Sequence, residues 1–269
     1  MHDHAAGALD LDVLVAVAAI LAGLSYVAAV AIQRSRGNIW PRRRSVLWLL
    51  GIAGATGGFV GPVAELAHDD FVAHMAQHVV VAMVAPLLLV LGAPVTLALR
   101  TMHATPARRV ARVLNSRLAR VIVHPITAAA LNVGGMWLLY LTPLYPAMVG
   151  SAWVHTIVML HLVLAGYLYT ASLIAVDPNP HRAGFGMRTV VLLLSLAAHA
   201  VLAKVLYAAP PPGVPIDEGQ AGAMLMYYLG DGVEVVLMVI LCAQWYRRVG
   251  RKRAGVTNSS RVRAVEARH

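Results

Sequence analysis

His74 and His78 stand four residues apart in a strongly apolar stretch of the chain. On an α-helix, side chains at positions i and i+4 lie on the same face, so the two imidazoles could share one metal ion. Met75 supplies a soft thioether nearby, although on another face of the helix. Asp70 lies one turn earlier and could orient the His74 imidazole by accepting a hydrogen bond from it. The spacing therefore predicts a metal site at the start of this helix.

Further side chains of the metal-ligand type occur in later apolar stretches. They are His155, His161, His199, Met224, Asp231 and Glu234. An ionisable group at the centre of a bilayer costs about 2.5–3.5 kcal/mol on insertion scales, so such residues usually serve a function. On a regular helix, His161 is turned about 120° from His155, so these two should serve different neighbours. We expect His155, His199 and Asp231 to join the metal site, and the other three to lie around it.

The positions of these residues along the expected helices place them at a common level. At 1.5 Å per residue, the ligand candidates lie within about 15 Å of the same end of the bundle. Glu65 and His68 lie at that end as well, and with Asp70 they could line an entrance for the ion. Each residue also has a structural explanation, because membrane histidines bond between helices and methionines fill cores. Asp231 could simply pair with Lys204 or with a histidine.

The donor types leave the metal open. Imidazole and thioether without thiolate suit copper, and Cu(I) in particular. Imidazole with carboxylate and water would suit zinc, which we expect less. Haem held by two histidines is a third option. Cys242 is the one cysteine, which excludes a multi-cysteine zinc or iron–sulfur site.

The composition indicates that membrane helices position these residues. Of the 269 residues, 59% are hydrophobic and 13% are charged, whereas a soluble domain carries about 25% charged residues. The net charge of +10 could suggest binding to nucleic acid. The basic residues, however, fall in short clusters between apolar runs, which is typical of membrane topology. We therefore expect contact with the lipid bilayer and no nucleic acid as a partner.

Apolar stretches long enough to cross about 30 Å of hydrocarbon as helices occur seven times. They lie at about 11–32, 45–66, 73–99, 121–141, 151–176, 187–208 and 221–246. The pattern predicts an all-α integral membrane bundle of seven transmembrane helices over 1–246. A basic tail over 247–269 follows, which we expect to be cytoplasmic and disordered.

The distribution of positive charge predicts how the bundle is oriented. Every Lys and Arg residue except Lys204 lies in the tail or in alternate connections between the apolar stretches. Connections rich in Lys and Arg stay on the cytoplasmic side of a membrane. We therefore expect a multi-pass protein of the cell membrane, with its amino terminus outside the cytoplasm and its basic tail inside. The metal site would then lie in the outer half of the bilayer.

The block from His74 to Val81 (HMAQHVVV), followed by the block from Ala85 to Pro94 (APLLLVLGAP), resembles the CtaG family of cytochrome c oxidase assembly factors. These are bacterial seven-helix membrane proteins, and the resemblance covers about 45–245. It implies a metallochaperone role without turnover, in which copper for haem–copper oxidases is handled outside the cytoplasm. The implied partners are cytochrome c oxidase subunits or an extracytoplasmic copper carrier. Carried over by position, His74 and His78 are the first ligands for copper.

Two other functional classes fit the same residues. The first is a zinc-dependent intramembrane hydrolase, in which zinc lowers the pKa of a bound water. Its site would be built from His74, His78, Ser195, His199 and Asp231. The second is a haem protein with histidines of two helices as axial ligands. A bundle whose polar groups only join its helices is the remaining explanation.

Overall fold

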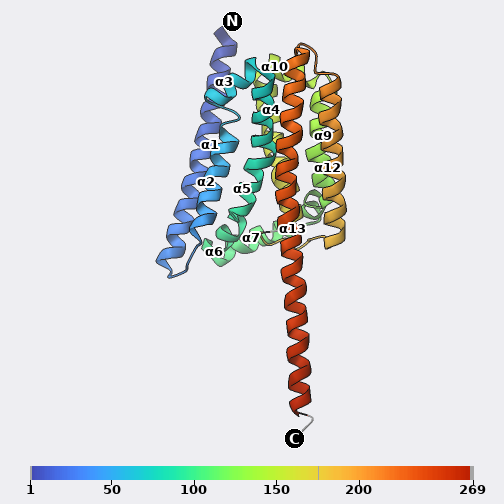
Figure 1. Cartoon of the computed structure of the whole chain (residues 1–269). Helices are drawn as coiled ribbons and strands as arrows, with labels where there is room; N and C mark the ends of the chain where they lie inside the picture. Colours follow the sequence, from blue (N-terminus) through green and yellow to red (C-terminus); the bar gives the residue numbers. More distant parts are fainter. Residues whose placement is uncertain (1, 175, 267–269) are drawn as a thin grey trace.

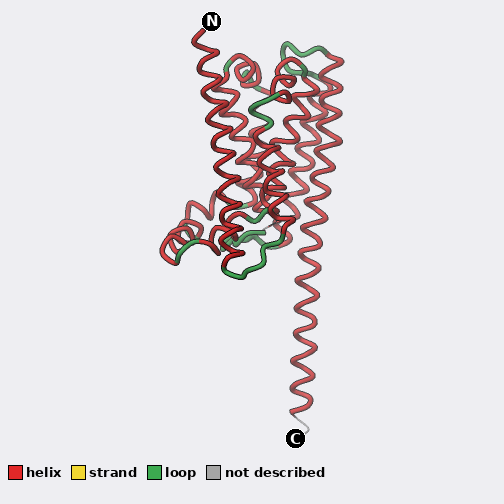
Figure 2. The backbone as a smooth tube through the Cα atoms, turned by 90° about the vertical axis from the view of Figure 1, so that its left-hand side faces the viewer, coloured by secondary structure: helices red, strands yellow, loops and turns green. Residues whose placement is uncertain are grey.

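The structure is a computed structural model that describes the backbone of residues 2–174 and 176–266. Side chains are described at 11, 13–61, 64–67, 70–174 and 176–250. Within these ranges the chain consists of helices and short connections, without a β-strand. Long helices run side by side in one bundle, and the two termini lie at opposite ends (Figures 1 and 2). The all-α fold predicted from the sequence is confirmed.

Most of the bundle consists of helices that run along its axis. In chain order these are α1 (His2–Ser35), α2 (Arg42–Thr56), α4 (Phe71–Val79), α5 (Ala85–Leu91), α9 (Pro125–Leu141), α11 (Ala152–Ile174), α12 (Phe185–Ala208) and α13 (Ile216–Glu266). A π-helical turn, η1 (Val80–Val84), joins α4 to α5.

Short helices close the two ends of the bundle (Figure 1). The end near the amino terminus carries α3 (Pro62–Asp69) and α10 (Leu144–Gly150), and we call it the amino-terminal face. The opposite end carries α6 (Pro94–Thr101) and α7 (Ala104–Leu114). The helix α8 (Arg117–Ile122) then leads the chain into α9.

Five segments of the described residues are long and apolar enough to cross a membrane. They are Val13–Ser35, Phe71–Thr101, Ala152–Ile174, Phe185–Ala208 and Ile216–Gly250. A sixth crossing results if α9 and α10, which meet at a bend of 79°, form one broken span. The chain is therefore a multi-pass membrane protein, while the number of seven crossings stays a prediction.

The helix expected over 45–66 is interrupted. Residues 57–61 separate α2 from α3, and among them Gly61 has φ +91°, a backbone conformation that favours glycine. The 15 residues of α2 span about 22 Å, short of the about 30 Å of a hydrocarbon core. Hydropathy does not show this break because the connection itself contains the apolar residues Phe59 and Val60.

The central helix changes geometry between α4 and α5. In η1 the Ala85 N–H bonds to the Val80 carbonyl, five residues back, instead of four. The next residue is Pro86, which has no N–H and whose ring would collide with the Ala82 carbonyl in a regular α-helix. The wider π turn accommodates the proline without ending the helix. The chain bends into α6 only at Ala93, which has φ 53°.

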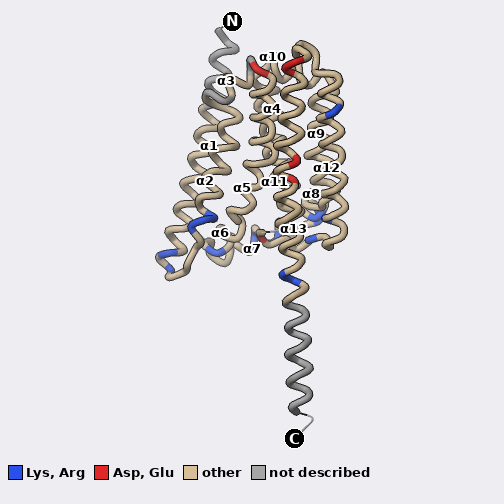
Figure 3. Tube along the Cα trace, viewed as in Figure 1, with Lys and Arg blue, Asp and Glu red and all other residues tan. Residues whose placement is uncertain are grey.

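Basic and acidic residues separate along the bundle axis (Figure 3). Lys and Arg gather at the end with α6 and α7, which we call the arginine-rich face, and several acidic residues lie at the amino-terminal face. This pattern is the one on which the predicted orientation rests, and the orientation in the membrane stays a prediction. The helix α13 continues beyond the arginine-rich face to Glu266, and the disorder of the tail over 247–269 stays a prediction.

Among the described residues, two large apolar cores fill the bundle, and a smaller buried cluster surrounds Trp40. The core nearer the amino-terminal face is rich in buried methionine, with Met75, Met83, Met136, Met148, Met159 and Met226. The other core is built mainly from leucine, valine and isoleucine of α5, α11, α12 and α13. Large apolar side chains also cover the outside of the bundle, as at Leu24 and Leu164, which suits contact with lipid. The buried polar residues discussed next lie in and below the methionine-rich core.

Candidate metal centre

The side chain of Asp70 caps the start of α4. Its Oδ1 accepts hydrogen bonds from the backbone N–H groups of Val72 (2.7 Å) and Ala73 (2.9 Å). These are two of the donors that a helix start leaves without a partner. The cap fixes where α4 begins, and therefore which face of the helix carries His74 and His78. The predicted hydrogen bond from His74 to the Asp70 carboxylate stays a prediction.

His74 lies buried among aromatic rings. Its Nε2 is 3.2 Å from the hydroxyl oxygen of Tyr140. Its ring centroid is 6.0 Å from that of Phe71, with the rings stacked, and 5.4 Å from that of Tyr145, edge to face. Tyr140 lies in the last turn of α9 and Tyr145 in the first turn of α10, so the bend between these helices brings both tyrosines over α4. The arrangement orients the imidazole and keeps water away from it.

His78 lies one turn deeper and is completely buried. Its Nε2 is 3.0 Å from the sulfur of Met136, and its Nδ1 has no hydrogen bond partner. Met136 and Tyr140 are four residues apart on α9, so they face His78 and His74 as a matching pair. The sequence did not single them out, because methionine and tyrosine in an apolar helix are usually core residues. Their shared spacing is the signal that could have found them.

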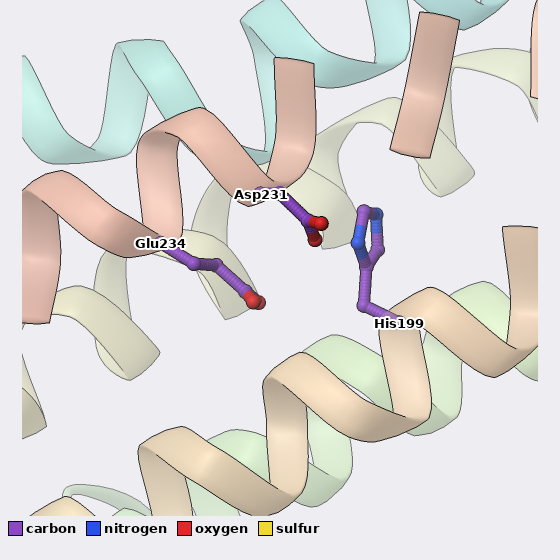
Figure 4. A group of neighbouring side chains, drawn as sticks. All are labelled: His199, Asp231 and Glu234. Atoms are coloured by element: carbon purple, nitrogen blue, oxygen red, sulfur yellow. The ribbon is translucent and has the colours of Figure 1, made fainter. Parts of the chain in front are cut away.

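A second polar group lies between α12 and α13. His199, Asp231 and Glu234 point toward one another (Figure 4), and one ligand atom of each lies within 4.8 Å of the others. Among the described residues, neither ring nitrogen of His199 has a hydrogen bond partner, nor have Asp231 Oδ1 and Glu234 Oε2. The helices α4 and α13 pack against each other, so this group is a neighbour of the first one.

A cavity of about 490 Å³ opens at the amino-terminal face beside Phe71 and Tyr145. Two acidic residues line it, Asp70 and Glu218, together with the loop that leads into α13. Phe71 and Tyr145 lie between the cavity and the His74 ring, since both line the cavity and both contact that ring. Asp70 is at the predicted entrance, whereas Glu218 is a lining residue that the sequence did not single out.

Several predicted residues lie outside these two groups. His161 is exposed, and its Nε2 lies 3.1 Å from the carbonyl oxygen of Leu131 on α9. His155 is half-buried near the start of α11. Glu65 is exposed on α3, and the side chain of His68 lies outside the described residues.

The two predicted methionines also face elsewhere. Met75 is buried, but it packs against α13 at Gly222. Met224 is exposed and lines a surface hollow of α12 and α13 together with Lys204 and Tyr227. The Lys204 ammonium lies 5.8 Å from the centroid of the Tyr227 ring and is not paired with the Asp231 carboxylate.

Comparison with known proteins places this arrangement in a family. The family model of the cytochrome c oxidase caa3 assembly factor matches residues 24–248. Uncharacterized proteins of Mycobacterium bovis, Mycobacterium tuberculosis and Mycobacterium leprae are each 31% identical over 258 residues. These matches cover 88% of this chain but 39% of each relative, so the chain spans about two fifths of their length. No solved structure matches the chain.

The matched range contains α4, α9 and the membrane part of α13, and with them both polar groups. The resemblance seen in the sequence is thereby confirmed, and the chain belongs to the family of cytochrome c oxidase caa3 assembly factors.

Proposed function

We propose that the chain holds one copper ion, as Cu(I), and hands it to a haem–copper cytochrome c oxidase during assembly. The observation that carries this proposal is the contact between His78 and Met136. A fully buried imidazole points its Nε2 at a thioether sulfur 3.0 Å away, while its Nδ1 has no partner. An imidazole nitrogen and a thioether sulfur that face each other inside the bundle can share one soft ion as neutral ligands.

The donor set supports Cu(I) as the cargo. Imidazole and thioether are ligands that copper accepts, and soft sulfur favours Cu(I) over Mg²⁺ or Ca²⁺. The ligands would be His74, His78 and Met136, which come from two neighbouring helices. All three are neutral, so they hold the ion without the charge attraction of a thiolate. This suits an ion that is passed on to a partner.

The acidic cavity supports a route for the ion. Asp70 and Glu218 make the amino-terminal face attractive to a cation, and Phe71 and Tyr145 stand between them and His74. We infer that this face lies outside the cytoplasm of a cell membrane, as the positive charge at the opposite face indicates. The partner there would be an oxidase subunit or an extracytoplasmic copper carrier. The role requires binding and transfer without catalysis.

The experiment measures copper on the full chain purified in detergent, loaded with Cu(I) under reducing conditions and competed with a Cu(I) chelator. The wild-type chain should retain about one copper ion, as a single site of this kind predicts. The double variant His74→Ala/His78→Ala should lose it. A matched control, His103→Ala/His161→Ala, also removes two histidines but leaves the site intact, so it should bind copper like the wild type.

Other outcomes would overturn the proposal. Stoichiometric copper in the His74→Ala/His78→Ala variant would place the ion elsewhere. Zinc in place of copper at these two histidines would favour the intramembrane hydrolase, and a Soret absorption band would favour a haem protein. Size-exclusion chromatography of each variant shows whether a loss of copper is instead a loss of fold.

A further inference from the structure

Two carboxylates lie inside the bundle without a Lys or Arg partner among the described residues. Asp231 and Glu234 are one turn apart on α13, in the middle of the span Ile216–Gly250. No ion pair joins either of them to a Lys or Arg residue of the described chain, and Lys204 lies over the Tyr227 ring instead. Two like charges side by side in a medium of low dielectric constant are unfavourable. They therefore need protons or a cation to compensate them.

The histidine opposite them provides a third unsatisfied group. His199 is 0% exposed, and Figure 4 shows its ring directed at the two carboxylates of α13. Both of its ring nitrogens lack a hydrogen bond partner, as does Glu234 Oε2 in a side chain that is 2% exposed. A group that served only to join α12 and α13 would satisfy these atoms with each other. Here the ligand atoms of His199, Asp231 and Glu234 lie within 4.8 Å of one another. Both His199 nitrogens, Asp231 Oδ1 and Glu234 Oε2 nevertheless make no hydrogen bond.

The backbone of α13 is shaped to let the histidine approach. A Cβ atom at Gly230 would overlap His199 Cε1 and would lie 3.1 Å from both ring nitrogens. Gly232, two residues further along, has nothing within 4 Å of its Cβ position. The glycine at 230 is therefore the one that admits the imidazole, because a larger residue would push it away from Asp231.

We propose that His199, Asp231 and Glu234 form a second metal site, which takes a divalent cation of the zinc class. The donors are one imidazole nitrogen and two carboxylate oxygens, with no sulfur, a set that suits Zn²⁺ with a water as the fourth ligand. The charge of two carboxylates is balanced by a divalent ion but not by Cu(I). This site is independent of the proposed copper role, since it shares no ligand with His74, His78 and Met136.

The test loads the full chain in detergent with Zn²⁺, and in parallel with Co²⁺ as a coloured substitute, and measures bound metal after desalting. The wild-type chain should hold about one zinc ion and show the visible absorption of four-coordinate Co²⁺. The variant Asp231→Asn/Glu234→Gln should lose both signals and keep its copper. His74→Ala/His78→Ala should keep zinc while it loses copper, which separates the two proposals.

A matched pair of glycine variants tests the same site without removing a ligand. Gly230→Ala should displace the imidazole and weaken zinc binding about 10–100-fold, the range for disturbing the support of a metal ligand. Gly232→Ala adds the same methyl group in open space and should bind zinc like the wild type. Zinc binding that is unchanged in both Asp231→Asn/Glu234→Gln and Gly230→Ala, or absent from the wild type, would overturn the proposal.

Discussion

Replacing Gly166 by alanine should push α11 away from the π turn that carries the central helix past its proline. A Cβ atom at 166 would overlap the Ala82 carbonyl oxygen and lie 2.9 Å from Pro86 Cγ. The carbonyl of Ala82 is the one that Pro86 cannot bond, because proline has no N–H. A backbone carbonyl and a proline ring cannot rotate out of the way, so the two helices have to separate.

The size of the effect follows from two opposing contributions. In the interior of a helix, alanine is favoured over glycine by about 1 kcal/mol. Overpacking a well-filled contact costs about 1–3 kcal/mol, and an obstacle in the backbone belongs at the upper end. Gly134 on α9 is the matched control, because a Cβ there has nothing within 4 Å. Gly134→Ala should thus be neutral or stabilising. The helix-propensity gain is the same in both variants and cancels, so Gly166→Ala should be less stable than this control by about 2–3 kcal/mol.

Unfolding of the detergent-solubilised chain in mixed micelles of increasing SDS content measures the difference, followed by tryptophan fluorescence. Copper binding should survive in Gly166→Ala, because the contacts of His74 with Tyr140 and of His78 with Met136 run to α9. Equal unfolding midpoints for Gly166→Ala and Gly134→Ala would refute the close contact between α11 and η1.

Two further changes test the contacts that hold the site and the arginine-rich face. Met136→Leu conserves volume and should cost less than about 1.5 kcal/mol of stability. It should nevertheless lower the Cu(I) affinity about 10–100-fold in a chelator competition. An unchanged Cu(I) affinity would show that the Met136 sulfur is not a ligand. Asp177 accepts hydrogen bonds from Val95 N (3.2 Å), Thr96 N (2.7 Å) and Thr96 Oγ1 (2.5 Å) at the start of α6. Asp177→Ala should therefore destabilise the chain by about 1–2 kcal/mol in SDS unfolding, and Asp177→Asn by less. If Asp177→Ala is as stable as the wild type, the cap contributes nothing.

The helical spacing of His74 and His78 was enough to predict that they share a face, and the structure buries both against α9. Spacing could not show what that face meets, since the partner helix and its rotation are decided by packing. Met136 and Tyr140 carry the same spacing on α9 but are not distinguishable from core residues in an apolar sequence.

Depth along a helix was easier to predict than direction around it. The helix positions place Met224 near the level of the ligand candidates, yet Met224 faces outward beside Lys204. His161 likewise points at a backbone carbonyl of α9. The expected span over 45–66 shows the matching weakness of hydropathy, which averages across a connection made of glycine and apolar residues. Rotation about a helix axis and breaks without polar residues are both properties of packing.

The π turn at Val80–Val84 has a consequence for the whole central helix, because it inserts one residue into the regular repeat. Each residue of an α-helix advances the side-chain direction by about 100°, so the extra residue shifts the phase of everything before it relative to everything after it. A helical wheel drawn through α4 and α5 with a constant repeat would therefore give the wrong direction for His74 and His78 relative to the side chains of α5. Shortening the turn by one residue would rotate both imidazoles away from Met136 without altering any of these side chains. The length of this turn thus decides which neighbouring helix the two histidines meet.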